Sequence, residues 1–113
     1  KLPFYYLGWR SESGDALPFF KSVIHSKEGV YGSYNGMNYK NQQVDALIEK
    51  SETNFNMQER LKDLQRVMEI IVQEDVVGVP LFETQSLFAF KKNLNFIPRV
   101  DSLVFPSKIS KIN

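Results

Sequence analysis

The chain has 113 residues, enough for one ordinary domain with a single core but too few for two. Hydrophobic residues make up 42% and charged residues 24%, a balance typical of globular proteins and not of disordered or fibrous ones. The net charge of +1 gives no overall field to attract nucleic acid or acidic lipid, and the lack of cysteine excludes disulfides and thiol catalysis.

The single histidine, His25, cannot form a histidine-rich metal site by itself, so we expect a packing or surface role for it. We expect no metal and no other cofactor. No apolar run approaches the ~20 residues that cross a bilayer. The chain shows no signal peptide and begins at Lys1 without an initiator methionine, so we expect a segment of a longer protein.

The first predicted element is a short buried strand at residues 2–7 (LPFYYL), because aromatic β-formers there precede a stop at Gly8. The stretch GWRSESGD then sets Trp9 close to Glu12 and Asp15 in a loop. A surface loop has no need of the indole, and a buried loop could not hold the carboxylates without partners. Two interpretations stay open: the wall of a ligand cleft, or a core tryptophan beside two solvated turn residues.

A short helix is predicted at residues 18–26, since proline is tolerated in a first turn and apolar residues recur on one face. That face carries Phe20, Val23 and Ile24. Residues 29–41 (GVYGSYNGMNYKN) predict an irregular loop with a turn at Asn35-Gly36. Tyr34 and Asn38 of this loop are candidate ligand contacts. The alternative is that the tyrosines pack the loop onto the domain.

Two helices follow, each with a starting asparagine. Asn41 can cap a helix with a stripe of Val44, Leu47, Ile48 and Ser51. Asn56 with Glu59 resembles a capping box and begins a longer helix at residues 57–74. Apolar residues recur along that helix in steps of four and three, which predicts a core-facing or helix-pairing stripe: Met57, Leu61, Leu64, Met68 and Ile71.

Two strands are predicted at residues 76–82 (VVGVPLF) and 87–90 (LFAF), with Pro80 directing the first to an edge or a bulge. After Phe90, five basic residues stand against Asp101 alone: Lys91, Lys92, Arg99, Lys108 and Lys111. Regularly spaced aromatic residues and nucleic-acid motifs are missing from this tail, so we expect a solvated face and no nucleic-acid partner.

The order of these features resembles the C-terminal part of the family 5 extracellular solute-binding proteins of ABC importers. The resemblance covers essentially all of the chain and rests on the order and spacing of its motifs. These motifs are Gly-Trp followed by two acids, a Gly/Asn/Tyr loop ending in NYKNQQVDALIEKSE, the helix ERLKDLQRVMEIIVQEDVVGVPLF, and AFKKNLNF. It implies an α/β fold, the C-terminal lobe portion of a two-lobed periplasmic-binding-protein-like (type II, cluster C) protein, with helices on a small mixed sheet. Residues 1–90 would belong to this lobe, and residues 91–113 would return toward the other lobe.

The resemblance also implies a ligand site between the lobes. By its position after Gly-Trp, Glu12 best matches the family's carboxylate that binds a peptide's ammonium, and Asp15 matches a second acidic position. That second acid is usually followed by proline in the family, whereas Ala16 follows it here. The predicted ligand-binding residues are therefore Trp9, Glu12, Asp15, Tyr34 and Asn38, and either acid could face the ligand.

The implied function is non-catalytic: capture of a short peptide, or a similar solute such as a sugar or a nickel chelate, and delivery to an ABC permease. The full-length protein would be a monomer outside the cytoplasm, in the periplasm or as a surface lipoprotein. One alternative is a structural or protein-interaction module without a ligand cleft. Another is a glycoside hydrolase using Glu12 and Asp15, although carboxylates three residues apart in a loop do not set the separation that hydrolysis needs.

Overall fold

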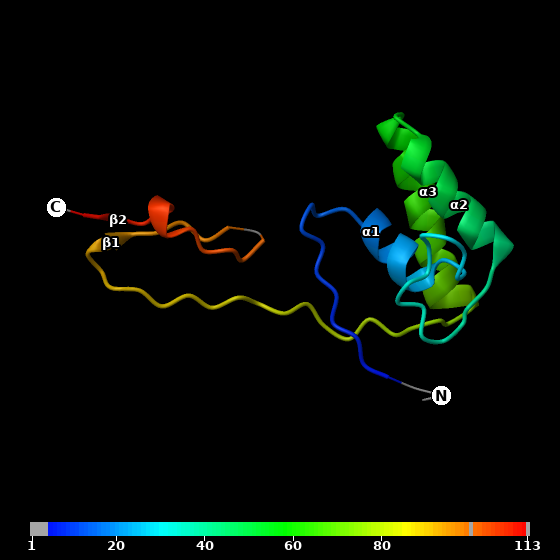
Figure 1. Cartoon of the computed structure of the whole chain (residues 1–113), viewed down its shortest axis with the longest axis horizontal. Helices are drawn as coiled ribbons and strands as arrows, with labels where there is room; N and C mark the ends of the chain where they lie inside the picture. The colour runs from blue at the N-terminus through cyan, green and yellow to red at the C-terminus, as the bar shows by residue number, and fades with distance from the viewer. Residues whose placement is uncertain (1–4, 100, 113) are drawn as a thin grey trace. The chain divides into compact units, whose positions relative to one another are not determined.

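A computed structural model describes residues 5–99 and 101–112 of the chain (Figure 1). The chain divides into two compact units, Lys1–Pro80 and Leu81–Asn113, and each is described by itself. The boundary predicted after residue 90 separates two lobes of a longer protein, and it stays a prediction. The assignment of this chain to a binding-protein lobe also stays a prediction.

The first unit is helical (Figure 1). Helix α1 (Leu17–Phe19) continues into a π-helical turn at Phe20–Ile24, which confirms the predicted helix at residues 18–26. Helix α2 spans Gln42–Thr53. Helix α3 spans Met57–Glu69 and continues as a π-helical turn at Ile70–Glu74.

Both predicted asparagine caps are confirmed. The Asn41 Oδ1 accepts the amides of the second and third residues of α2 at 3.0 and 3.4 Å. The Asn56 Oδ1 does the same for α3 at 3.1 and 3.3 Å, which satisfies donors that the first helical turn leaves unpaired. The reciprocal half of the capping box is wrong, because Glu59 accepts from the Asn54 side chain at 3.1 Å and not from the Asn56 amide.

The core of the first unit lies where the two π-helical turns, α2 and α3 meet. It comprises Phe20, Val23, Ile24, Val44, Ile48, Leu64, Val67, Ile70 and Ile71. The predicted stripe of α3 is therefore only partly right: Met57, Leu61 and Met68 are 72%, 56% and 41% exposed. The spacing correctly locates an apolar surface on α3. That surface is wider than the face of α3 that packs into the core.

The predicted strands are wrong where the structure describes them. Residues 5–7, 76–82 and 87–90 carry no strand, and residues 2–4 lie outside the described residues. A strand needs a neighbour for its backbone N–H and C=O groups. The apolar, β-forming composition of these segments favours strands. Composition does not identify a second strand with which they would pair.

The second unit holds a two-stranded antiparallel sheet, in which β1 (Leu94–Asn95) pairs with β2 (Ser110–Lys111). A 3₁₀ turn at Pro106–Lys108 precedes β2. The Phe96 ring lies 5.4 Å from that of Phe88 and 5.3 Å from that of Phe90. None of the described residues of this unit is buried, so these aromatic contacts do not amount to a core.

Candidate functional site

Trp9 lies in an aromatic cluster with Phe19 and Tyr34. Its ring centroid is 5.7 Å from that of Phe19 and 6.2 Å from that of Tyr34, with interplanar angles of 62° and 66°. Such edge-to-face pairs are favourable beyond the area they bury. Trp9 remains 39% exposed and Tyr34 63%, so the cluster is open to solvent and the indole is not sealed in the core.

The segment that carries Trp9 lies along the loop that carries Tyr34. Four residues before Trp9, the ring of Tyr5 lies 3.2–3.3 Å from the point where a Cβ on Gly36 would stand. A side chain at Gly36 would therefore crowd the Tyr5 ring. The Tyr5–Gly36 and Trp9–Tyr34 contacts together hold the two segments side by side.

Buried Asn35 organises the loop from within. It is 1% exposed, and its Nδ2 donates to the carbonyls of His25 and Tyr39 at 3.0 and 2.8 Å. Its Oδ1 accepts the Tyr39 amide at 3.0 Å. The asparagine thus ties both ends of the loop together and sets the backbone immediately after Tyr34.

The three tyrosines of the loop have different roles. Tyr31 stacks on buried His25 with centroids 4.2 Å apart and donates to Glu52 at 2.9 Å, which confirms the packing role of that histidine. Tyr39 donates to Asp75, and burial followed by this carboxylate holds the pKa of Tyr39 well above its usual value. Packing thus accounts for two tyrosines, while Tyr34 stays at the surface.

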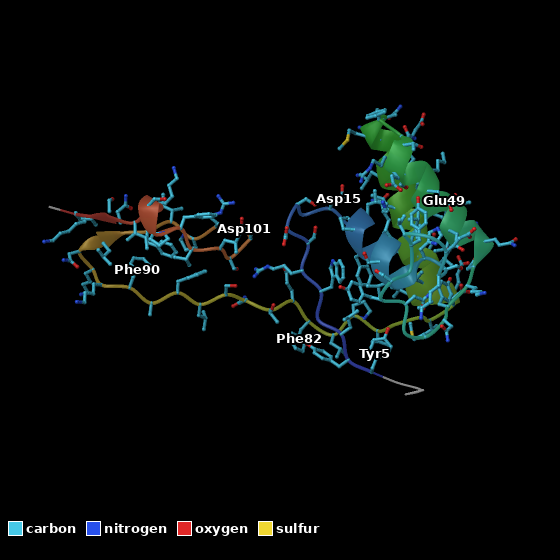
Figure 2. All side chains as sticks on the ribbon, in the orientation of Figure 1. Tyr5, Asp15, Glu49, Phe82, Phe90 and Asp101 are labelled. Atoms are coloured by element: carbon cyan, nitrogen blue, oxygen red, sulfur yellow. The ribbon has the colours of Figure 1, made fainter. Side chains whose placement is uncertain are left out.

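Asp15 is engaged on both carboxylate oxygens. Oδ1 accepts the Leu17 amide at 2.8 Å, and Oδ2 accepts from Arg60 Nη2 at 2.7 Å. Burial opposes ionisation, but the Leu17 amide and the Arg60 guanidinium outweigh it, so the pKa of Asp15 lies below its ordinary value. Figure 2 shows Asp15 on the loop that leads into α1. Its charge serves to hold this loop to α3.

Replacing Arg60 with methionine is expected to destabilise the first unit by about 1–3 kcal/mol at neutral pH, because a half-buried carboxylate loses its charged partner. A lowered carboxyl pKa contributes stability above the unfolded value and loses it as pH falls through the folded pKa. Urea unfolding should therefore show the difference between wild type and R60M shrinking from about pH 5 to pH 2. A difference independent of pH would contradict the assigned pair.

The other predicted acid, Glu12, is exposed. The ion pairs among the described residues do not include it. Glu12 is thus the carboxylate of this loop that remains available to a ligand. Asn38 is also exposed and has a left-handed backbone (φ 54°), but no described aromatic or hydrogen-bonded contact joins it to Trp9 or Tyr34.

A groove of about 450 Å³ lies between the Asp15 loop and α3. Its lining comprises Ser13, Gly14, Asp15, Ala16, Phe20, Arg60, Leu61, Leu64, Gln65 and Met68. Of the five predicted site residues, only Asp15 lines it.

Sequence reasoning missed both Phe19 in the cluster and Arg60 beside Asp15. An aspartate two residues before a helix start is a signal for the bond to the Leu17 amide. No local signal identifies Arg60, which lies 45 residues along the chain.

No protein-family model matches the chain, and no curated protein or solved structure matches it. Among the described residues, no group of three or more acidic, histidine or cysteine side chains could hold a metal ion. The described helices are all too short or too polar to cross a membrane.

Proposed function

We propose that this chain is part of the substrate-binding component of an ABC importer, which captures a short peptide in a cleft between two lobes and passes it to the membrane permease. The observation that carries the proposal is the open aromatic cluster of Trp9, Phe19 and Tyr34, with Glu12 exposed on the loop that follows. The full-length protein would act outside the cytoplasm.

The chemistry of this surface suits a peptide with a free amino terminus. The half-exposed indole offers a rigid face for a peptide plane, and an ammonium near such a face gains cation–π attraction. Glu12 would accept the ammonium in a charge-assisted hydrogen bond. Asp15 would instead shape the loop through Arg60, which favours Glu12 of the two candidate acids.

Calorimetric titration of the full-length protein that contains this chain with tri-alanine tests the proposal, because the proposed cleft needs both lobes. We expect Glu12→Gln to weaken binding about ten- to a hundredfold, since charged hydrogen bonds contribute ~1.5–3 kcal/mol. N-acetylation of the peptide should weaken wild-type binding similarly. Glu28→Gln, at an exposed carboxylate outside the aromatic cluster, is the matched control and should leave affinity unchanged. Equal affinities of wild type, E12Q and Trp9→Ala would refute the proposed site.

The second unit favours one other function, a protein-interaction module. Large apolar side chains are exposed along it, among them Leu87 at 92% and Ile97 at 78%. Exposed apolar surface of this kind marks contact surfaces in many proteins. Light scattering that reveals a stable oligomer would support this alternative. The glycoside hydrolase finds less support, because Asp15 is already bound by Arg60.

A further inference from the structure

His25 is a buried titratable side chain that the candidate site does not use. It is 1% exposed, and both of its ring nitrogens face oxygen atoms that accept hydrogen bonds. Nδ1 lies 2.8 Å from the Ser26 carbonyl oxygen, and Nε2 lies 3.2 Å from Oε1 of Glu49. A neutral imidazole has one N–H group and can donate to only one of these oxygens, whereas an imidazolium donates to both. The hydrogen-bond geometry around this ring therefore fits the protonated form.

The charges beside the ring also fit a cation. Asp45 Oδ1 lies 3.6 Å from Nδ1 of His25, so carboxylates of α2 approach both ring nitrogens. Among the described residues, neither Asp45 nor Glu49 has another ion-pair partner. A buried imidazolium without a counter-charge would be costly, and these two carboxylates provide that counter-charge.

The remaining charged and titratable groups of the segments around this ring are bound to one another or are exposed. Lys21, from the first π-helical turn, pairs with Glu52 of α2. Asp75, just after the second π-helical turn, accepts from Tyr39. The other three are exposed around a polar groove: Lys27, Glu28 and Lys40. The two carboxylates described above thus remain the counter-charge of the imidazole.

The imidazole joins α2 to the loop at residues 29–41. Tyr31 of this loop stacks on it with ring centroids 4.2 Å apart and an interplanar angle of 17°. A cationic ring gains additional attraction from such an aromatic face. Asp45 is held in place because its Oδ1 accepts the Ser26 amide at 3.0 Å. The Glu49 side chain is 53% exposed, so it can turn into water when its attraction to the ring is lost.

We propose that His25 is a pH-sensitive clamp between α2 and the loop at residues 29–41. The imidazolium holds Glu49 and Tyr31 together, and the neutral ring releases Glu49 and stacks less firmly on Tyr31. The clamp therefore stabilises the loop while His25 is protonated, and this stabilisation is lost as the pH rises through the titration of His25. The inference goes beyond the proposed function and does not depend on peptide binding.

Hydrogen exchange of two backbone amides measures the clamp. The amides of Gly32 and Tyr34 tie the loop to the first π-helical turn, because they donate to the carbonyls of Lys21 and Ser22 at 2.8 Å each. We expect their protection factors to fall about fivefold from about pH 5.5 to about pH 8.5, as for an ion pair with one half-exposed partner. ¹⁵N NMR of the only histidine of the chain follows the protonation of the ring in the same samples.

Glu49→Gln should abolish this pH dependence. The glutamine can accept from the protonated ring through its Oε1 and donate to the neutral ring through its Nε2, so both forms of His25 keep a partner. Glu59→Gln is the matched control, with the same change of charge at an exposed position of α3 that has no described contact with His25. It should keep the wild-type pH dependence. Thermal unfolding of E49Q at the higher pH should match wild type, since Glu49 lies at the surface.

Three results would overturn the clamp. The first is equal protection of the two amides at both pH values although NMR shows that the ring has lost its proton. The second is a wild-type pH dependence in E49Q, and the third is a ring that is already neutral at the lower pH. None of these results bears on peptide binding, and failure of tri-alanine to bind would leave the clamp intact, so the two proposals fail separately.

Discussion

Replacing Phe20 with alanine is expected to lower the free energy of unfolding of the first unit by about 3–5 kcal/mol. The side chain is 0% exposed and belongs to a small core formed by four helical segments. A cavity at this point has few neighbours that could move to fill it. The loss is a large share of the stability of a small domain, about 5–15 kcal/mol in total.

Urea unfolding followed by circular dichroism measures the effect. Phe55→Ala is the matched control, because Phe55 is 97% exposed between α2 and α3 and its truncation should cost less than about 0.5 kcal/mol. Similar losses in the two variants would contradict the assigned core. If F20A retains its fold, its aromatic cluster should also loosen, because the Phe19 ring packs against Phe20.

The second large effect is expected for Gly32→Ala. Gly32 has φ +64°, and a Cβ there would lie 2.5 Å from the His25 carbonyl oxygen and 2.8 Å from that of Ser26. These are backbone atoms, so the loop would have to shift. We expect a loss of about 1 kcal/mol for the left-handed conformation and a further 1–3 kcal/mol for the clash.

Gly29→Ala separates these two costs. Gly29 also has a positive φ, +55°, but nothing lies within 4 Å of its Cβ position. Gly29→Ala should therefore show only the first cost, about 1 kcal/mol. Equal melting temperatures for the two variants would contradict the close approach at Gly32.

Gly32→Ala also tests how the loop supports the candidate site. The amides of Gly32 and Tyr34 donate to the carbonyls of Lys21 and Ser22, both at 2.8 Å. A displaced loop would move Tyr34 away from Trp9. We therefore expect the indole N–H resonance of Trp9 to shift in G32A and not in G29A.

Local signals in the sequence were sufficient for the helices. Asn41 and Asn56 can each satisfy the first turn that follows, and the apolar spacing of α2 and α3 depends only on positions within one helix. The irregular loop at residues 29–41 could be predicted for the same reason. Glycine and asparagine favour turns through the conformation of their own backbone. Such effects extend over a few residues and need no knowledge of the rest of the chain.

Contacts between distant residues could not be predicted in this way. The strands expected at residues 76–82 and 87–90 depend on a pairing neighbour, and composition does not identify one. The same holds for Asp15, because its ion pair with Arg60 joins residues 45 positions apart in the chain. Even on α3, spacing alone could not distinguish Leu64, which is buried, from Leu61, which is not.

By itself the sequence determined where the helices of this protein begin, which of their residues are apolar, and that Trp9 is followed by two acids. Only the tertiary structure decided that Trp9 meets Phe19 and Tyr34 at an open surface and that Asp15 is paired with Arg60. The physical reason is range: capping and helical spacing act within about one turn of backbone, whereas burial and ion pairing depend on which distant segments share a surface.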